Sequence, residues 1–313
     1  MIFVDAHCDT VLKLLEEENS NLLNNNFHFD ILRAKSNGNY LQFLASFIEP
    51  SYGQAYSLRR ALQLIDRLYK EAEIHKDHMM LCCNYNDINK AFSVNKLAGL
   101  ISIEGGEALQ GEISVLRCLY KIGVRSICLT WNHRNEIADG VSDGSTGGGL
   151  SPFGREVVRE MNSLGMLIDV SHLSEKGFWD VVENSEKPII ASHSNAKAIC
   201  DNRRNLTDDQ ILAISKIGGT IGINLYPEFL NNTQDASLKD IILHIEHIAS
   251  IAGNDILGLG ADFDGIECTP RDITGVQDIG KIIEELYRLN YSEEFIEKFA
   301  GQNFLRVIKE VIG

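Results

Sequence analysis

The 313-residue chain contains 44% hydrophobic and 23% charged residues, values that are ordinary for a globular protein with a sizeable core. Its 44 acidic residues outnumber its 29 basic ones, and the resulting net charge of −15 argues against nucleic-acid binding, which needs a concentrated basic surface. The sequence shows no apolar run of about 18 residues and no signal-like N-terminus, so we expect neither a membrane span nor secretion.

Eight short, nearly continuous apolar segments predict strands of a parallel sheet that is covered on both faces. In chain order they span residues 2–9, 40–48, 97–106, 124–131, 166–172, 188–194, 219–226 and 256–265. The segments between them are typical of helices. One begins at Ser151 and Pro152 and ends at Gly165. Another covers 238–252, with one apolar stripe and Gly253 as its stop.

This alternation of strands and helices predicts an α/β fold, specifically a (β/α)8 TIM-like barrel that forms a single domain over residues 1–313. An open doubly wound sheet is the alternative. In a barrel, the residues that carry the chemistry lie at the carboxyl ends of the strands.

Polar side chains gather at those strand ends. In the first segment, "FVDAHCDTV", His7 and Asp9 are two residues apart and therefore point to the same side of a strand, away from Cys8. Other polar residues end or follow the later segments: Glu104, Trp131, His133, His172, His193, Asp262 and Asp264. A set of metal-capable groups at one end of so many strands predicts a site rather than scattered surface residues.

The number and type of these side chains favour a site for two divalent metal ions with an open position for water. We place His7 and Asp9 on one metal and His172 and His193 on the other, with Glu104 able to bridge them. Mixed nitrogen and oxygen ligation without thiolate makes Zn2+ the expected metal, with manganese, cobalt and iron as alternatives. Such a pair predicts hydrolysis of an amide or a related bond.

Several longer motifs resemble the membrane (renal) dipeptidase family of zinc peptidases, which lies within the amidohydrolase-like barrels. They are "DAHCDT", "ISIEGGEAL", "LTWNHRNEIADG", "GLSPFGREVVREMNSLGMLIDVSH", "IIASHSNAKAICDNRRNL" and "GLGADFDG". The resemblance runs in order over nearly the whole chain and is weakest in roughly residues 50–95. Vertebrate members of that family carry a signal, disulfides and a lipid anchor, and because this sequence shows none of these features it resembles a bacterial-type member.

The resemblance implies a two-zinc dipeptidase with the same five ligands, Glu104 being the bridge. It also implies that Asp262 moves a proton from the attacking water to the leaving amine. Arg204 would hold the terminal carboxylate of the substrate, for which its planar guanidinium is suited. Tolerance of a C-terminal D-residue, side activity on β-lactam-like amides and a homodimer are further implications.

One position departs from the family pattern, which often has "LTH" after the fourth predicted strand. This chain has Trp131 there and His133 two residues later, in "LTWNH". Because alternate residues of an extended segment share a face, we expect His133 to replace the family histidine at the substrate carbonyl, with Trp131 also contacting substrate.

Two other functions stay open. One is a different two-metal amidohydrolase acting on a lactone, cyclic amide or β-lactam, which would not need Arg204. The other is a non-catalytic homologue that binds a small molecule or a metal. Seven cysteines, odd in number and without a C-x-x-C motif, favour a reducing cytoplasmic location for any of these.

Some polar residues have plainer interpretations. We expect Asp264 to hydrogen-bond the loop at its strand end rather than to bind metal, and Asp169 to have a structural role. His244 and His247 lie off the apolar stripe of their predicted helix and are expected at the surface.

Overall fold

The computed structural model describes residues 1–17 and 19–313. Over these residues the strands form one parallel sheet. They are β1 Ile2–Cys8, β2 Asn39–Phe47, β3 Met79–Leu81, β4 Leu97–Glu104, β5 Val124–Cys128, β6 Leu167–Asp169, β7 Ile190–Ala191, β8 Thr220–Ile223 and β9 Leu257–Leu259. Strand β1 pairs with both β2 and β9, and β2 pairs with β4, so all strands except β3 close into a barrel. The predicted TIM-like barrel is confirmed, and the open sheet is excluded.

Strand β3 is the one strand of the described sheet that the sequence did not predict. It pairs with residues 97–99 at the beginning of β4 and is not part of the closed ring of strands. Several predicted strands are also shorter than expected. β7, for example, covers only Ile190–Ala191 within the predicted segment 188–194. The site residues that follow these strands therefore lie in loops rather than in the sheet.

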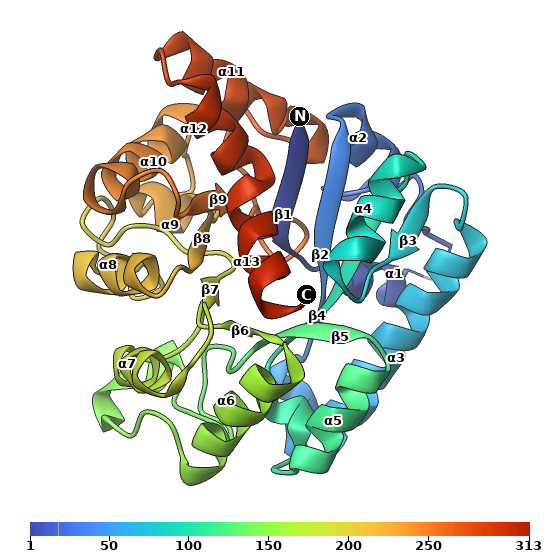
Figure 1. Cartoon of the computed structure of the whole chain (residues 1–313), viewed down its shortest axis with the longest axis vertical. Helices are drawn as coiled ribbons and strands as arrows, with labels where there is room; N and C mark the ends of the chain where they lie inside the picture. The colour runs from blue at the N-terminus through green and yellow to red at the C-terminus, as the bar shows by residue number, and fades with distance from the viewer. Residues whose placement is uncertain (18) are drawn as a thin grey trace.

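Helices surround the barrel, as Figure 1 shows. The described α-helices are α1 Thr10–Glu16, α2 Ile31–Ser36, α3 Gly53–Ile74, α4 Tyr85–Ser93, α5 Ile113–Lys121, α6 Pro152–Leu164, α7 Glu175–Asn184, α8 Asp208–Lys216, α9 Pro227–Asn231, α10 Leu238–Ala252, α11 Gly280–Arg288, α12 Glu293–Glu297 and α13 Asn303–Val311. Short 3-10 helices lie at Pro50–Tyr52, Gly106–Leu109, Val141–Thr146 and Val276–Asp278, and a short π-helix at Lys298–Gln302 joins α12 to α13.

The two helices with the clearest sequence signals form as predicted. In α6, the Ser151 hydroxyl accepts a hydrogen bond from the Gly154 amide at 2.9 Å, and Gly165 ends the helix with a φ of 74°. Helix α10 ends at Gly253. Both helices therefore have the caps that their sequences indicate.

One end of the barrel is closed by α13, which crosses the middle of Figure 1 in red. Its Phe304 and Ile308 belong to one buried apolar cluster with Val4, Leu41 and Leu167, which lie near the beginnings of their strands. The carboxyl ends of the strands, where the polar residues gather, are thus at the opposite end.

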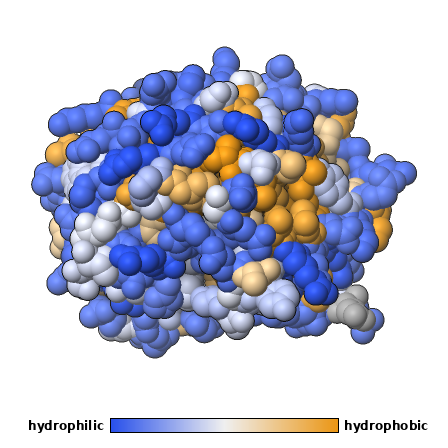
Figure 2. All heavy atoms as spheres, turned by 90° about the horizontal axis from the view of Figure 1, so that it is seen from below, coloured by the Kyte–Doolittle hydropathy of each residue, from blue (hydrophilic) through white to orange (hydrophobic). Residues whose placement is uncertain are grey.

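Figure 2 shows one face of the protein that is largely hydrophilic, with its largest hydrophobic area to the right of the centre and smaller ones elsewhere. In the described ranges, none of the helices combines the length and apolar character required to cross a bilayer.

Candidate metal centre

Six of the predicted site residues meet at the carboxyl end of the barrel. His7 belongs to β1, and Asp9 follows that strand. Glu104 is the last residue of β4. The other three lie in the loops after β6, β7 and β9: His172, His193 and Asp262. All six are at most 8% exposed. The strand ends expected from the sequence therefore converge in space.

Backbone hydrogen bonds join the loops that carry these residues. The Asp9 amide donates to the Phe263 carbonyl at 2.9 Å, and the Asp262 amide donates to the His7 carbonyl at 3.2 Å. Asp262 has a φ of 62°, a left-handed conformation that turns the chain sharply after β9. The ends of β1 and β9 thus hold one another in place.

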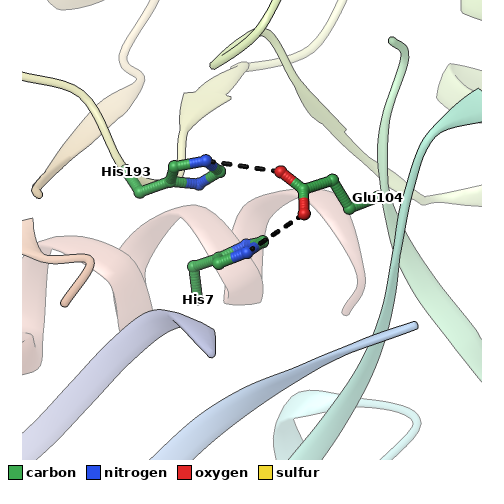
Figure 3. Close-up of side chains that lie close together, drawn as sticks. All are labelled: His7, Glu104 and His193. Carbon is green, nitrogen blue, oxygen red and sulfur yellow. Dashed lines mark ion pairs between the residues drawn. The ribbon is translucent and has the colours of Figure 1, made fainter. Parts of the chain in front are cut away.

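Glu104 lies between the histidines, as Figure 3 shows for His7 and His193. Its Oε2 is 3.4 Å from Nε2 of His7, and its Oε1 is 3.5 Å from Nε2 of His193. The same Oε1 is 2.8 Å from Nε2 of His172. One carboxylate therefore faces imidazoles on two sides, which is the arrangement that a bridging ligand requires.

The remaining carboxylates lie around His7. Its Nε2 is 3.2 Å from Oδ2 of Asp9 and 3.8 Å from Oδ1 of Asp262. Potential ligand atoms of His7, Asp9 and Asp262 lie within 4.8 Å of one another, as do those of His7, Glu104 and His193. The cluster can thus be divided into two overlapping sets of ligands.

The charges within this buried cluster favour a cation. Burial raises the pKa of Asp9 to about 6 and that of Asp262 to about 7. For His7, burial acts to lower the pKa, but Glu104 and Asp9 outweigh it and raise the pKa well above its usual value. The carboxylates thus stabilise a positive charge at their centre, and a bound metal ion would supply one.

The other two histidines are neutral by the same reasoning. Burial, followed by the charge of Arg204, lowers the pKa of His172 to about 4. Burial, followed by the charge of His7, lowers the pKa of His193 well below its usual value. Neutral imidazole is the form that binds metals.

The donor set fits divalent metal ions. In the described residues, Oδ1 of Asp9 is buried and has no hydrogen-bond partner, which is costly unless a cation contacts it. The groups able to hold a metal contain imidazole and carboxylate but no thiolate. Such ligands suit zinc, manganese and related ions.

Gly265 makes room for two of the acidic side chains. A Cβ atom at this position would overlap Oδ2 of Asp9 and lie 2.6 Å from Oδ1 of Asp262. The glycine of the "ADFDG" motif is therefore needed for the packing of the cluster, because any side chain would displace a carboxylate.

Arg204 lies beside the cluster and is only 5% exposed. Its Nη2 is 3.1 Å from Nε2 of His172 and donates to the His193 carbonyl at 3.3 Å, while its Nη1 donates to the Ser171 carbonyl. Its Nε has no partner among the described residues. Arg204 lines one cavity of about 400 Å³ with all residues of the cluster except His7, together with Phe47, Trp131, Tyr226 and Phe229.

The expected contact of His133 with this site is not formed. Its side chain is 65% exposed and lines a neighbouring cavity with Glu107 and Glu136. The expectation assumed an extended segment, but the chain bends after β5. Trp131 does line the cavity that contains Arg204, with its ring 5.4 Å from that of Phe47 and 6.2 Å from that of His172.

Asp264 and Asp169 have the structural contacts expected of them. Asp264 accepts hydrogen bonds from the Thr10 hydroxyl at 2.5 Å and the His28 amide at 2.7 Å. Asp169 accepts from the Ser171 hydroxyl at 2.7 Å and the Ser192 amide at 3.0 Å. Both carboxylates thereby fix loops at the ends of their strands.

The surface position expected for His244 is wrong. Its side chain is fully buried, where Nδ1 accepts from the Ala196 amide at 3.1 Å and Nε2 donates to the Leu230 carbonyl at 2.8 Å. The loop after β7 and helix α9 cover this side of α10, which the helix periodicity alone does not reveal. His247 is partly exposed and pairs with Asp208 at 2.9 Å.

Three polar residues in contact with the cluster were not singled out from the sequence. Asn132 Oδ1 lies 2.9 Å from Nδ1 of His172, and Ser192 Oγ lies 2.7 Å from Nδ1 of His193. Asn224 donates from Nδ2 to Oδ2 of Asp262 at 2.8 Å. Asn132 and Ser192 lie in the motifs "LTWNH" and "IIASHS". Their closeness in sequence to candidate site residues was the one feature of the sequence that could have identified them.

Comparisons with known proteins agree with this geometry. A family model described as membrane dipeptidase (peptidase family M19) matches residues 1–312. The chain is 32% identical over 326 aligned positions to an uncharacterised dipeptidase from Schizosaccharomyces pombe, covering 98% of this chain and 80% of that protein.

Two solved structures have nearly the same fold. One is described as the dipeptidase AC, a metallopeptidase of family M19, with a TM-score of 0.94, 26% identity and coverage of 100% of this chain and 99% of that one. The other is a Rhodobacter sphaeroides metallopeptidase liganded with a phosphinate mimic of the dipeptide L-Ala-D-Ala, with a TM-score of 0.93, 25% identity and 99% coverage of both chains. Because the family model spans almost every residue, the chain belongs to the membrane dipeptidase family, peptidase family M19.

Proposed function

We propose that this protein is a metal-dependent dipeptidase that uses two divalent metal ions to hydrolyse the peptide bond of free dipeptides. The observation that carries the proposal is the presence of a metal-capable cluster and the buried Arg204 in one cavity of about 400 Å³. The cluster suits hydrolysis, and the guanidinium suits a carboxylate close to the bond that is cut.

We assign His7 and Asp9 to one metal, His172 and His193 to the other, and Glu104 to both. The distances from the two Glu104 oxygens to imidazoles on either side support this division. Zinc is the proposed metal because the ligands are imidazole and carboxylate. When bound, the metals would polarise the scissile carbonyl and make water acidic enough to attack near neutral pH.

Asp262 is the proposed proton carrier. Burial raises its pKa to about 7, so its Oδ1 can take a proton from water and release it to the leaving amine at neutral pH. The other oxygen, Oδ2, is fixed by Nδ2 of Asn224 at 2.8 Å. The orientation and the pKa of Asp262 thus both suit transfer of a proton from the attacking water to the leaving amine.

Arg204 is proposed to bind the C-terminal carboxylate of the substrate. Its guanidinium lies 3.1 Å from Nε2 of His172, so a bound carboxylate would lie close to the second metal position. This short span limits the substrate to about two residues. The dipeptide mimic bound by the Rhodobacter sphaeroides relative ends in D-Ala, and we extend tolerance of a C-terminal D-residue to this chain.

The alternative two-metal hydrolase, if it acts on a lactone or a small cyclic amide, would leave Arg204 without a role. A buried guanidinium with an unpartnered Nε within the described structure favours a substrate that carries a carboxylate. A non-catalytic homologue is disfavoured because all five proposed ligands and Asp262 are present.

We also propose that the protein is a single domain, is located in the cytoplasm and forms a homodimer. The family match over residues 1–312 supports a single domain. Seven cysteines without disulfides among the described residues support a reducing, cytoplasmic location. The homodimer rests on the family resemblance, and light scattering of the purified protein would test it.

A panel of L-L and L-D dipeptides, each as the free acid and as the C-terminal amide, tests the proposed function. Cleavage of free dipeptides that is lost on amidation supports both the hydrolytic site and the role of Arg204. Equal cleavage of acids and amides would instead support the general amidohydrolase.

A further inference from the structure

We propose that Asp169 and Ser192 are positioning residues that orient His193 toward the metal before any metal binds. The inference rests on the proposed function, because it concerns the metal centre assigned there. It adds two buried groups behind one proposed ligand: the hydroxyl of Ser192, which contacts the His193 imidazole, and the carboxylate of Asp169, which contacts that hydroxyl.

The three groups form a continuous series of hydrogen bonds. Ser192 Oγ lies 2.7 Å from Nδ1 of His193 and also bonds to Oδ2 of Asp169. Asp169, Ser192 and His193 are at most 3% exposed. The backbone amide of Ser192 donates to Oδ1 of Asp169 at 3.0 Å, which fixes the serine relative to the carboxylate. Water therefore has little access to this chain of groups.

The direction of each hydrogen bond follows from the chemistry of the groups. An ionised carboxylate can only accept, so the Ser192 hydroxyl must give its one proton to Asp169. The serine oxygen is then free to accept, and the proton between it and His193 must come from Nδ1. A neutral imidazole carries a single N–H, so Nε2 of His193 is left with a free lone pair.

That lone pair faces the cluster. Nε2 of His193 lies 3.5 Å from Oε1 of Glu104 and 2.8 Å from Nε2 of His172, inside the proposed ligand set. A carboxylate behind the serine also makes the serine oxygen a better acceptor, which increases the basicity of the imidazole as a ligand. Asp169 thereby acts on the metal site without touching it.

His172 is held in the same tautomer by different groups. Its Nδ1 faces Oδ1 of Asn132 at 2.9 Å, and its Nε2 faces Nη2 of Arg204 at 3.1 Å. Guanidinium groups only donate and the Asn132 Oδ1 only accepts, so both of these contacts are satisfied when Nδ1 of His172 carries the proton and Nε2 accepts. The two histidines are therefore oriented alike, but only His193 depends on Asp169 and Ser192.

The chain offers a matched control on the other side of His193. Ser194 is also buried, yet its hydroxyl has no hydrogen-bond partner among the described residues. Ser192→Ala and Ser194→Ala remove the same atom from neighbouring buried positions. Only the first removes a hydrogen bond to a proposed ligand.

Two measurements test the proposal: the zinc affinity of variants, and the position of the proton on the His193 imidazole. Metal-stripped wild type, Ser192→Ala, Ser194→Ala and Asp169→Asn would be titrated with zinc against a chromophoric chelator. We expect Ser192→Ala and Asp169→Asn to bind one of two zinc ions about tenfold to a hundredfold more weakly, and Ser194→Ala to bind as wild type does. Equal zinc affinity in Ser192→Ala and Ser194→Ala would overturn the proposal.

Nitrogen-15 NMR of the metal-free wild type gives a second readout that needs no variant. We expect His193 to carry its proton on Nδ1, and a proton on Nε2 would contradict the proposal even if a variant failed to fold. A wild type that binds no zinc would instead count against the proposed function, so the two failures are distinguishable.

Discussion

Oε1 of Glu104 lies 2.8 Å from Nε2 of His172, while the other oxygen of the same carboxylate faces His7 at 3.4 Å. No other carboxylate in the described cluster faces imidazoles from both sides. Glutamine keeps one oxygen as a possible ligand. Its second oxygen is replaced by an NH2 group, which does not bind a cation. We therefore expect Glu104→Gln to bind at most one zinc ion per chain.

The loss of a bridge should also reduce catalysis. We expect kcat/KM of Glu104→Gln to fall by at least about a hundredfold. Losing a residue that only hydrogen-bonds a metal ligand costs up to about a hundredfold, and losing a ligand should cost at least as much. Metal analysis after gel filtration, combined with dipeptide kinetics, checks this. Two tightly bound zinc ions in the variant would contradict the bridging role.

Arg204 should contribute to substrate binding through the substrate carboxylate. Hydrogen bonds to charged groups contribute about 1.5–3 kcal/mol, so Arg204→Ala should lower kcat/KM for free dipeptides by roughly 10- to 150-fold. Arg203 is exposed and adjacent in sequence, so Arg203→Ala is the control. An equal loss for free and C-amidated dipeptides would show that Arg204 does not recognise the carboxylate.

Gly265→Ala should disrupt the site without unfolding the barrel. The added Cβ would overlap Oδ2 of Asp9 and approach Oδ1 of Asp262, so both carboxylates must move. We expect at least about a tenfold loss of zinc affinity, comparable to losing an outer partner of a ligand. Gly144→Ala is the control because its Cβ would meet only Ser174 at 3.9 Å. Unchanged zinc binding in Gly265→Ala would refute the steric argument.

His133 should be dispensable for catalysis. Its side chain is 65% exposed and is not among the residues that line the cavity containing Arg204. We expect His133→Ala to keep kcat/KM within about threefold of wild type, since exposed substitutions away from a site have small effects. Dipeptide kinetics would decide, and a loss of a hundredfold or more would restore the catalytic role expected from the sequence.

His244 should make stability depend on pH. Burial lowers its pKa to about 4 from a usual value near 6.5, so the unfolded chain takes up a proton that the folded chain refuses. Its contribution to stability is complete above pH 6.5 and is lost progressively as the pH falls toward 4, at up to about 1.4 kcal/mol per pH unit. Between pH 7 and 5, unfolding free energies should therefore fall less in His244→Gln than in wild type.

His247→Gln, on the same helix, is the control for that measurement because its side chain is partly exposed. Urea unfolding of the three proteins at both pH values provides the free energies. Parallel losses in wild type and His244→Gln would exclude His244 as the source of the pH dependence.

The barrel and the metal-capable residues could be predicted because strand periodicity and strand-end position are local properties of the sequence. Glu104 ends an apolar run, and Asp9 follows another, so the parallel sheet brings them together without further information. Ser151 and Gly253 likewise carry local capping signals that α6 and α10 use.

The expectations from the sequence were wrong where contacts between residues distant in the sequence determine the position of a side chain. The bend after β5 turns His133 away, although extended alternation would have brought it back to the site. His244 is buried by α9 and the loop after β7, which are distant in sequence. The roles of Ser192 and Asn132 depend on hydrogen bonds that no spacing rule specifies.

The most direct test of the central claim is hydrolysis of L-Ala-D-Ala by metal-stripped protein before and after zinc is added back. The account predicts no cleavage by the stripped protein and full cleavage once two zinc ions per chain are bound. Undiminished cleavage by protein shown to be free of metal would contradict it.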